Sequence, residues 1–239
     1  MHLLVLTLLG AGLLPAADPP EAPYGCLYQP AYSLDEKPRP PAEPYEPQPG
    51  DLLFFDDHAW SWQICFYMAG AHRPMHAGIV VRLPDGGLAA LEAGYNDTMW
   101  IETIPLAGRL PKFKGAIWVR RRAEPLTEEQ SAKLTEFALA ATKRLFALHR
   151  LIGQLTPFRS RGPIKTFFLG KPHGLRCCFF CSECVMEGCV YAELLDPKTT
   201  RPAATYPRDM FFDRSPNIYL NKHLKLAPDW ELPQLWTQQ

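Results

Sequence analysis

The chain has 239 residues, 47% of them hydrophobic and 12% aromatic, which is enough to bury one substantial core. Its 25 Lys and Arg balance 25 Asp and Glu, and a net charge of zero argues against an electrostatic nucleic-acid binder. The 7 cysteines are too few for a small disulfide-stapled scaffold. We therefore expect a globular protein that does not bind nucleic acid.

An uncharged, leucine-rich run from Leu3 to Leu14 stands near the start of the sequence, followed by Pro15-Ala16-Ala17. The pattern is typical of a secretory signal peptide, with His2 where a positive residue is usual. The run is too short to span a bilayer comfortably. We expect residues 1–17 to direct export, which gives a secreted or periplasmic protein of the cell envelope with no stable membrane span.

Ten of the 25 prolines lie between Asp18 and Gly50. Proline has no backbone N–H and cannot continue a helix or a strand ladder, so repeated proline pairs favour an extended chain. The sequence therefore predicts a proline-rich arm or linker over residues 18–49. A single folded domain is expected over residues 50–239.

Short strands and helices alternate in the predicted domain. Strands are expected at 52–55, 77–83, 88–93, 115–121 and 218–226, and Pro84-Asp85-Gly86-Gly87 predicts a hairpin turn. Helices are expected at 60–69, 127–148 and 181–194. The second helix has the clearest signal, because Thr127 begins a capping box and apolar residues recur at helical intervals. We interpret that apolar stripe as core.

Five of the cysteines lie between Cys177 and Cys189, and three chemistries compete for this cluster. Cys178, Cys181 and Cys184 resemble the start of an iron–sulfur run, but Cys189 comes one residue late. Overlapping C-x-x-C pairs favour thiol–disulfide exchange, yet the usual redox βαβ context is missing. The third alternative is one activated nucleophile among cysteines that pack as small hydrophobes.

A cysteine nucleophile requires a base, and His76 is the best candidate. It begins the β-rich run His76-Ala77-Gly78-Ile79-Val80-Val81, which would hold its ring on a rigid strand. Glu92 lies in the otherwise apolar returning strand, where it could orient the imidazole. A hairpin centred between Asp85 and Gly86 places His76 opposite Tyr95 or Asn96. Glu92 would then reach His76 only through a bulge or a splayed strand end.

Five short motifs occur in a fixed order along residues 50–226. The motifs are Gly50-Asp51-Leu52-Leu53-Phe54-Phe55, His76-Ala77-Gly78-Ile79-Val80-Val81, Glu92-Ala93, Phe180-Cys181-Ser182-Glu183 and Tyr206-Pro207-Arg208-Asp209-Met210. Together they resemble the permuted, YiiX-like papain-fold cysteine hydrolases, relatives of the NlpC-type cell-wall peptidases and of lecithin:retinol acyltransferase. The resemblance implies an α+β, papain-like fold, circularly permuted, with a small antiparallel sheet packed against helices.

The resemblance also implies roles for individual residues. Cys181 becomes the nucleophile at the start of a helix, His76 the base and Glu92 the orienting group, with Asn96 in reserve as the third member. The family pattern does not require cysteines around Cys181, so an intrachain disulfide could inactivate or regulate the site. Arg73, just before the histidine strand, is a candidate for binding a substrate carboxylate.

We therefore expect an exported thiol hydrolase that cleaves amide bonds, such as those of cell-wall peptides, through a thioacyl intermediate. The alternatives are a lipid acyl hydrolase or acyltransferase on the same fold, a non-catalytic envelope-binding module, and a metal or redox protein built on the cysteine cluster. We expect no cofactor and no stoichiometric metal. The partner is expected to be a small peptide or lipid-like substrate. Aromatic residues in this part of a chain are more often core than cleft, and the candidates for the cleft are Trp60, Trp62, Phe66, Tyr67 and Phe179.

Overall fold

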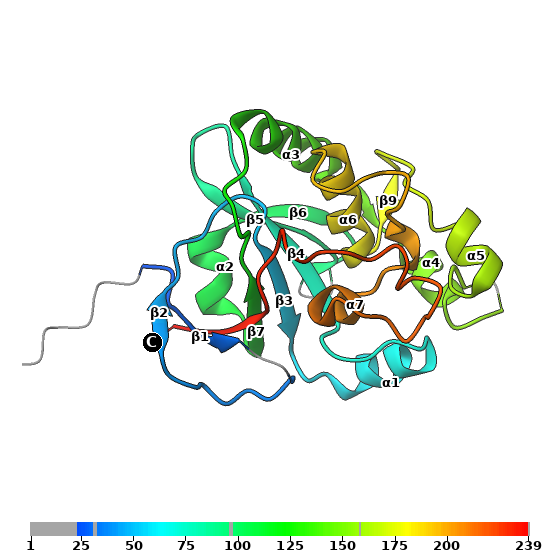
Figure 1. Ribbon diagram of the computed structural model, residues 1–239, viewed down its shortest axis with the longest axis horizontal. Coiled ribbons are helices and arrows are strands. Elements are labelled where there is room, and N and C mark those ends of the chain that lie inside the picture. Colours follow the sequence, from blue (N-terminus) through cyan, green and yellow to red (C-terminus); the bar gives the residue numbers. More distant parts are fainter. Residues whose placement is uncertain (1–22, 31–32, 96–97, 158, 239) are drawn as a thin grey trace, which may run out of the picture.

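A central antiparallel sheet organises the molecule (Figure 1). The computed structural model describes residues 23–30, 33–95, 98–157 and 159–238. The sheet has eight strands in the order β2-β1-β10-β7-β3-β4-β5-β6. Their bounds are β1 Cys26–Pro30, β2 Ala42–Pro44, β3 Leu52–Asp56, β4 His76–Arg82, β5 Leu88–Ala93, β6 Ile101–Pro105, β7 Ala116–Arg120 and β10 Gln234–Thr237. A separate parallel pair joins β8 (Leu145–Phe146) and β9 (Cys178–Phe179).

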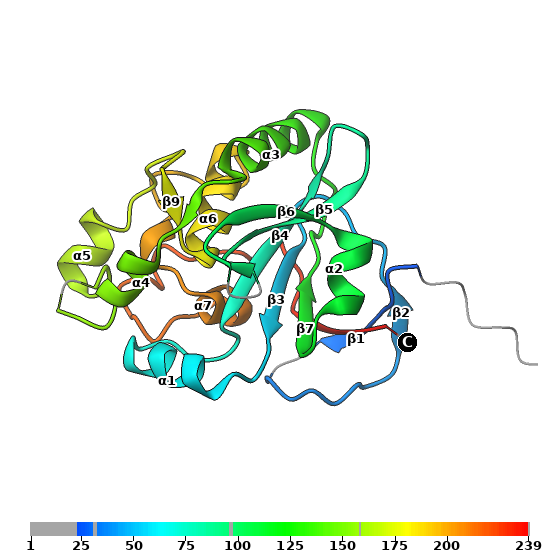
Figure 2. The same ribbon diagram turned by 180° about the vertical axis from the view of Figure 1, so that it is seen from behind.

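Helices lie on both faces of the sheet (Figures 1 and 2). Their bounds are α1 Trp60–Met68, α2 Leu106–Lys112, α3 Glu128–Ala141, α4 Leu148–Gly153, α5 Pro163–Phe168, α6 Cys181–Tyr191 and α7 Pro207–Phe212. Helices α3 and α6 pack on each other and on β4, whereas α2 packs on β5 from the other side. The chain therefore has a mixed α/β fold in which helices cover an antiparallel sheet.

The continuous apolar run of β3 follows from this double coverage. Leu52 and Phe54 belong to the core cluster under α3, α6 and α7, while Leu53 and Phe55 belong to a second cluster that includes Leu106 of α2. Alternate residues of a strand point to opposite faces, so a strand buried on both sides needs apolar residues throughout. The placement of β3 fixes its neighbour β4, which carries the candidate histidine.

Several predicted elements are confirmed. The strands expected around 52–55, 77–83, 88–93 and 115–121 are β3, β4, β5 and β7. Helix α3 begins with the predicted capping box, in which Thr127 accepts from the Gln130 backbone and the Gln130 side chain accepts in return. The helix expected over 127–148 ends earlier, at Ala141, because Leu145 lies in β8 and Leu148 begins α4. The prediction of a strand at 218–226 is wrong. That segment forms turns instead, and β10 adds the strand beside β7.

The prediction that the proline-rich stretch forms no strand ladder is also wrong. Strand β1 pairs with β10, and β2 pairs with β1. Proline is tolerated where a backbone N–H is not needed, and here Pro30 and Pro44 lie at the ends of their strands. These strands enlarge the expected small sheet. The papain-like permutation and the domain boundary at residue 50 stay predictions.

The signal peptide expected over residues 1–17 lies outside the described residues. Within the described part of the chain, no helix is both long and apolar enough to cross a bilayer.

Leu27 provides a test of the role of β1, because its side chain is fully buried in the second core cluster. We expect Leu27→Ala to lower the free energy of unfolding by about 2–5 kcal/mol, the usual cost of a buried leucine truncation. Urea denaturation followed by circular dichroism measures this. The exposed Glu46 supplies a control, and Glu46→Ala should change stability by less than about 0.5 kcal/mol. Equal, small effects would make this segment a dispensable arm.

Candidate active site

Cys181 is the first residue of α6, and its side chain lies against the end of β4. It is 5% exposed, and its Sγ lies 3.9 Å from the backbone oxygen of Met75. The first backbone N–H groups of a helix have no intrahelical partner, and no side chain caps them at the start of α6. The positive end of the helix dipole favours a thiolate at this position.

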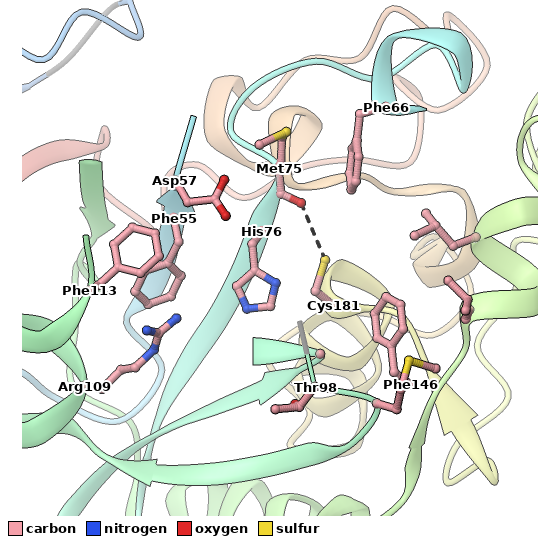
Figure 3. Close-up of a pocket in the computed structure, with 14 residues that line it drawn as sticks. Phe55, Asp57, Phe66, Met75, His76, Thr98, Arg109, Phe113, Phe146 and Cys181 are labelled. Carbon is pink, nitrogen blue, oxygen red and sulfur yellow. Dashed lines mark hydrogen bonds between the residues drawn. The ribbon is translucent and has the colours of Figure 1, made fainter. Parts of the chain in front are cut away.

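His76 is the first residue of β4, and its imidazole lies close to the Cys181 sulfur (Figure 3). Its Nε2 lies 2.7 Å from Oε2 of Glu92, and its ring lies 5.7 Å, centroid to centroid, from the Phe55 ring. The three side chains of the predicted triad therefore meet at one place. A rigid strand holds the histidine, and the helix start supplies the cysteine.

The register of the β4–β5 hairpin explains how Glu92 reaches His76. Glu92 lies opposite Gly78, so Glu92 and His76 are diagonal neighbours on one face of the sheet. The predicted bulge or splayed strand end is wrong. The predicted register assumed a turn centred between Asp85 and Gly86, and the actual pairing differs from it by one residue. At the turn, the Leu83 N–H donates to the Gly87 carbonyl, and Gly86 has a positive φ of 88°.

Gly78 leaves the space that the glutamate side chain occupies. A Cβ at this position would lie 2.8 Å from Cγ of Glu92, closer than real Cβ contacts. Glycine is therefore needed here because of a close approach rather than a special backbone angle. Asn96, the reserve third member, lies outside the described residues.

Arg109 of α2 holds the other side of the Glu92 carboxylate, and the sequence analysis missed it. Its Nε donates to Oε1 at 2.6 Å and its Nη2 donates to Oε2 at 2.9 Å. Both side chains are almost completely buried, and the guanidinium carbon lies 4.4 Å from the Phe55 ring centroid. The available signal was an arginine among the leucines of a short apolar segment, since a buried arginine needs an anionic partner.

The charged groups of this cluster favour the charged forms of both His76 and Glu92. Burial lowers the pKa of His76, but Cys181 and Glu92 raise it more, to about 9 from the usual 6.5. Burial raises the pKa of Glu92, but His76 and Arg109 lower it more, and the net shift is downward. A raised histidine pKa stabilises the folded state fully below pH 6.5, and this contribution is lost as the pH rises through about 9.

Arg73 has its own partners in the protein. It pairs with the buried carboxylate of Asp56 and, at 2.6 Å, with Glu36. It does not appear among the residues that line the cavity beside Cys181. The geometry therefore does not bring Arg73 to the other predicted site residues, and Arg109 is the arginine that faces the cavity.

The other described cysteines of the cluster differ from Cys181 in their surroundings. All are free thiols, with Cys177 exposed and its sulfur 3.8 Å from that of Cys178. Burial raises the pKa of Cys184 well above its usual value and that of Cys189 to about 12. These two behave as small apolar side chains. Among the described residues, no His, Cys, Asp and Glu side chains converge in a group of three or more that could hold a metal ion.

A cavity of about 210 Å³ opens beside Cys181 and His76 (Figure 3). Most of its lining is apolar, with residues Phe55, Phe66, Met75, Met99, Phe113, Phe146, Leu148 and Leu151. Of the predicted cleft aromatics, Phe66 lines the cavity, Phe179 lies in the core, and Trp60 and Tyr67 are exposed. The side chain of Trp62 lies outside the description.

Comparison with solved structures gives a distant likeness. No protein-family model matches the chain, and no curated protein matches its sequence. The crystal structure of the metalloprotein yiiX from Escherichia coli O157:H7 is similar at a TM-score of 0.46 and 17% identity. The match covers 82% of this chain and 99% of that chain. This likeness is too distant to assign a role to any residue.

Gly78→Ala should disturb the site without removing any of its polar groups. The added Cβ displaces Glu92, so we expect the His76 pKa to fall from about 9 toward 6.5. NMR titration of the imidazole measures the shift, and circular dichroism monitors the fold. Gly108, next to Arg109, is a matched control because a Cβ there meets nothing within 4 Å. An unchanged His76 pKa in Gly78→Ala would contradict the role given to this glycine.

Proposed function

We propose that the chain is a thiol hydrolase in which Cys181 is the nucleophile and His76 the general base. The observation that carries the proposal is the meeting of Cys181, His76 and the buried Glu92 beside an apolar cavity that Cys181 and His76 line. Nucleophile, base and orienting carboxylate are the three groups that covalent acyl transfer requires. Export of the protein by residues 1–17 remains part of the proposal.

The first half of the reaction forms a thioacyl enzyme. Because Nε2 of His76 bonds to Glu92, Nδ1 is the ring atom left for the thiol proton. The thiolate then attacks a substrate carbonyl, and the Cys181 backbone N–H at the helix start stabilises the oxyanion. The imidazolium returns its proton to the leaving amine as the carbon–nitrogen bond breaks. The acyl group stays on the Cys181 sulfur.

The second half releases the acyl group. His76 takes a proton from water, the resulting hydroxide attacks the thioester, and the protonated histidine restores the Cys181 thiol. Glu92 keeps the ring in one orientation and stabilises its charged form. Arg109 holds Glu92 by two hydrogen bonds, so it acts as a positioning residue that does not touch the reacting atoms.

Amide bonds are the substrate class we propose first, with cell-wall peptides as the expected source in the envelope. A second candidate is an ester or amide of a lipid-like acyl group. The predominantly apolar lining of the cavity favours this alternative, because burial of an alkyl or aromatic group there gains hydrophobic free energy.

The cysteines should differ in their reaction with iodoacetamide. In a Cys177→Ser background, which removes an exposed thiol, we expect Cys181 to react before the buried Cys184 near neutral pH. His76→Ala should slow the labelling of Cys181 by about tenfold or more. The exposed His72, which does not line the cavity, gives the control His72→Ala. Peptide mass spectrometry identifies the labelled residues. Equal labelling of Cys181 and Cys184 would remove the proposed nucleophile.

A parallel assay distinguishes the candidate functions. The purified protein and Cys181→Ala are each incubated with a stem-peptide mixture and with a phospholipid and acyl-ester panel. We expect turnover of small amide-linked peptides that is lost in Cys181→Ala. Turnover confined to the lipid panel would show that the amide assignment is wrong. Binding of either class without any Cys181-dependent turnover would instead support a binding module.

A further inference from the structure

Basic residues are concentrated in one part of the sequence. Residues 137–182 contain eight Lys and Arg and no Asp or Glu, although the whole chain has no net charge. The eight are Lys143, Arg144, Arg150, Arg159, Arg161, Lys165, Lys171 and Arg176. Three of them pair with carboxylates from later in the chain, which are the buried Glu183 and Asp209. Arg159 and Lys171 are exposed cations.

Large apolar side chains are exposed on helices of this stretch and on the earlier helix α1. They occur on α1, on α4 and its following loop, and on α5 and its following residue: Trp60, Ile64, Tyr67, Met68, Ile152, Leu155, Ile164, Phe167, Phe168 and Leu169. Trp60 is 74% exposed and Ile164 is 70% exposed, so neither side chain belongs to the core. Helix α1 carries no charged side chain at all.

These three helices lie together at the end of the molecule away from β1 and β2 (Figures 1 and 2). A hollow lined by Met68, Leu155 and Ile164 joins α1 to the segment between α4 and α5. Arg161 also donates to the backbone oxygen of Gly70, just after α1, at 3.2 Å. The apolar residues therefore form one surface rather than scattered contacts. We call the exposed side chains of α1, α4 and α5, with Arg159 and Lys171, the basic–apolar end.

The basic–apolar end adjoins the candidate active site. Phe66 of α1 and Leu148 and Leu151 of α4 line the cavity beside Cys181. The same helices thus contribute to the cavity wall with one side and to the exposed surface with another. A molecule or membrane that binds the basic–apolar end would therefore lie next to the cavity.

We propose that the basic–apolar end docks the protein on an anionic lipid bilayer. Exposed aromatic and aliphatic residues insert into the interface of a bilayer, and neighbouring cations attract anionic headgroups. Both components are present here, with the apolar side chains on or beside short surface helices and the cations Arg159 and Lys171 in the segments that adjoin α5. Lys171 Nζ lies 5.6 Å from the Phe167 ring centroid, which places a cation beside an apolar anchor. This docking does not depend on catalysis, because none of the exposed residues belongs to the Cys181 machinery.

A protein partner fits the same surface less well. Protein interfaces surround an apolar centre with a rim of mixed polar groups. By contrast, the exposed cations of this end, Arg159 and Lys171, lie in a stretch of 46 residues, 137–182, that contains no Asp or Glu to repel a negatively charged surface. Charge complementarity therefore favours the lipid surface.

Vesicle co-sedimentation tests the proposal with the full chain. Vesicles of phosphatidylcholine alone are compared with vesicles that also contain phosphatidylglycerol, at low and at high salt. We expect binding to the anionic vesicles that weakens as salt screens the charges. The double variant Ile164→Ser/Phe168→Ser and the charge variant Arg159→Glu/Lys171→Glu should each reduce that binding by about tenfold or more.

A matched variant controls for loss of apolar surface in general. Leu139 and Leu232 are each 47% exposed, and neither lies on α1, α4 or α5. Leu139→Ser/Leu232→Ser should bind the vesicles like the unmodified protein, and circular dichroism checks that every variant folds. The proposal is overturned if anionic vesicles are not bound or if the control variant loses binding equally. It is also overturned if size-exclusion chromatography shows a dimer that Ile164→Ser/Phe168→Ser dissociates, since the surface would then be a protein interface.

Discussion

The buried carboxylate of Glu92 is the interaction on which the candidate site depends. An ionised carboxylate in a protein interior is costly unless charged hydrogen-bond partners surround it. His76 and Arg109 provide those partners from a strand and from a helix on the same face of the sheet. The need to satisfy this one charge therefore fixes the position of the imidazole, and with it the side of the cavity from which a proton can move.

The sequence predicted those site residues that neighbouring residues identify, and it did not predict contacts between distant segments. Cys181 and His76 carry local signals, because a cysteine cluster precedes a helix and a histidine opens a strand. The regular pairing that brings Glu92 to His76 could not be predicted, because a one-residue difference in the turn at Gly86 changes every cross-strand neighbour. The local signal of Arg109, an arginine in a short apolar segment, does not name its partner, because the contact with Glu92 forms only when α2 folds back over β5.

The fold shows the same division between local and long-range information. Hairpin β4–β5 and helix α3 follow from turn and capping residues close in sequence, and both were predicted. The pairing of β1 with β10 joins opposite ends of the element order, and proline content argued against it. Composition also averages over the chain, so a net charge of zero conceals the separation of basic residues into one region.

The position of β10 between β1 and β7 constrains the order in which the chain can fold. Strand β10 comes last of all the elements along the chain, yet β1 and β2 join the sheet only through it. The segment from β3 to α7 can collapse during synthesis, while the first two strands must wait for β10. During that interval the edge of β7 lacks this neighbour and is open to pairing with another chain. A chaperone that shields a strand edge would be most useful to this protein at that moment.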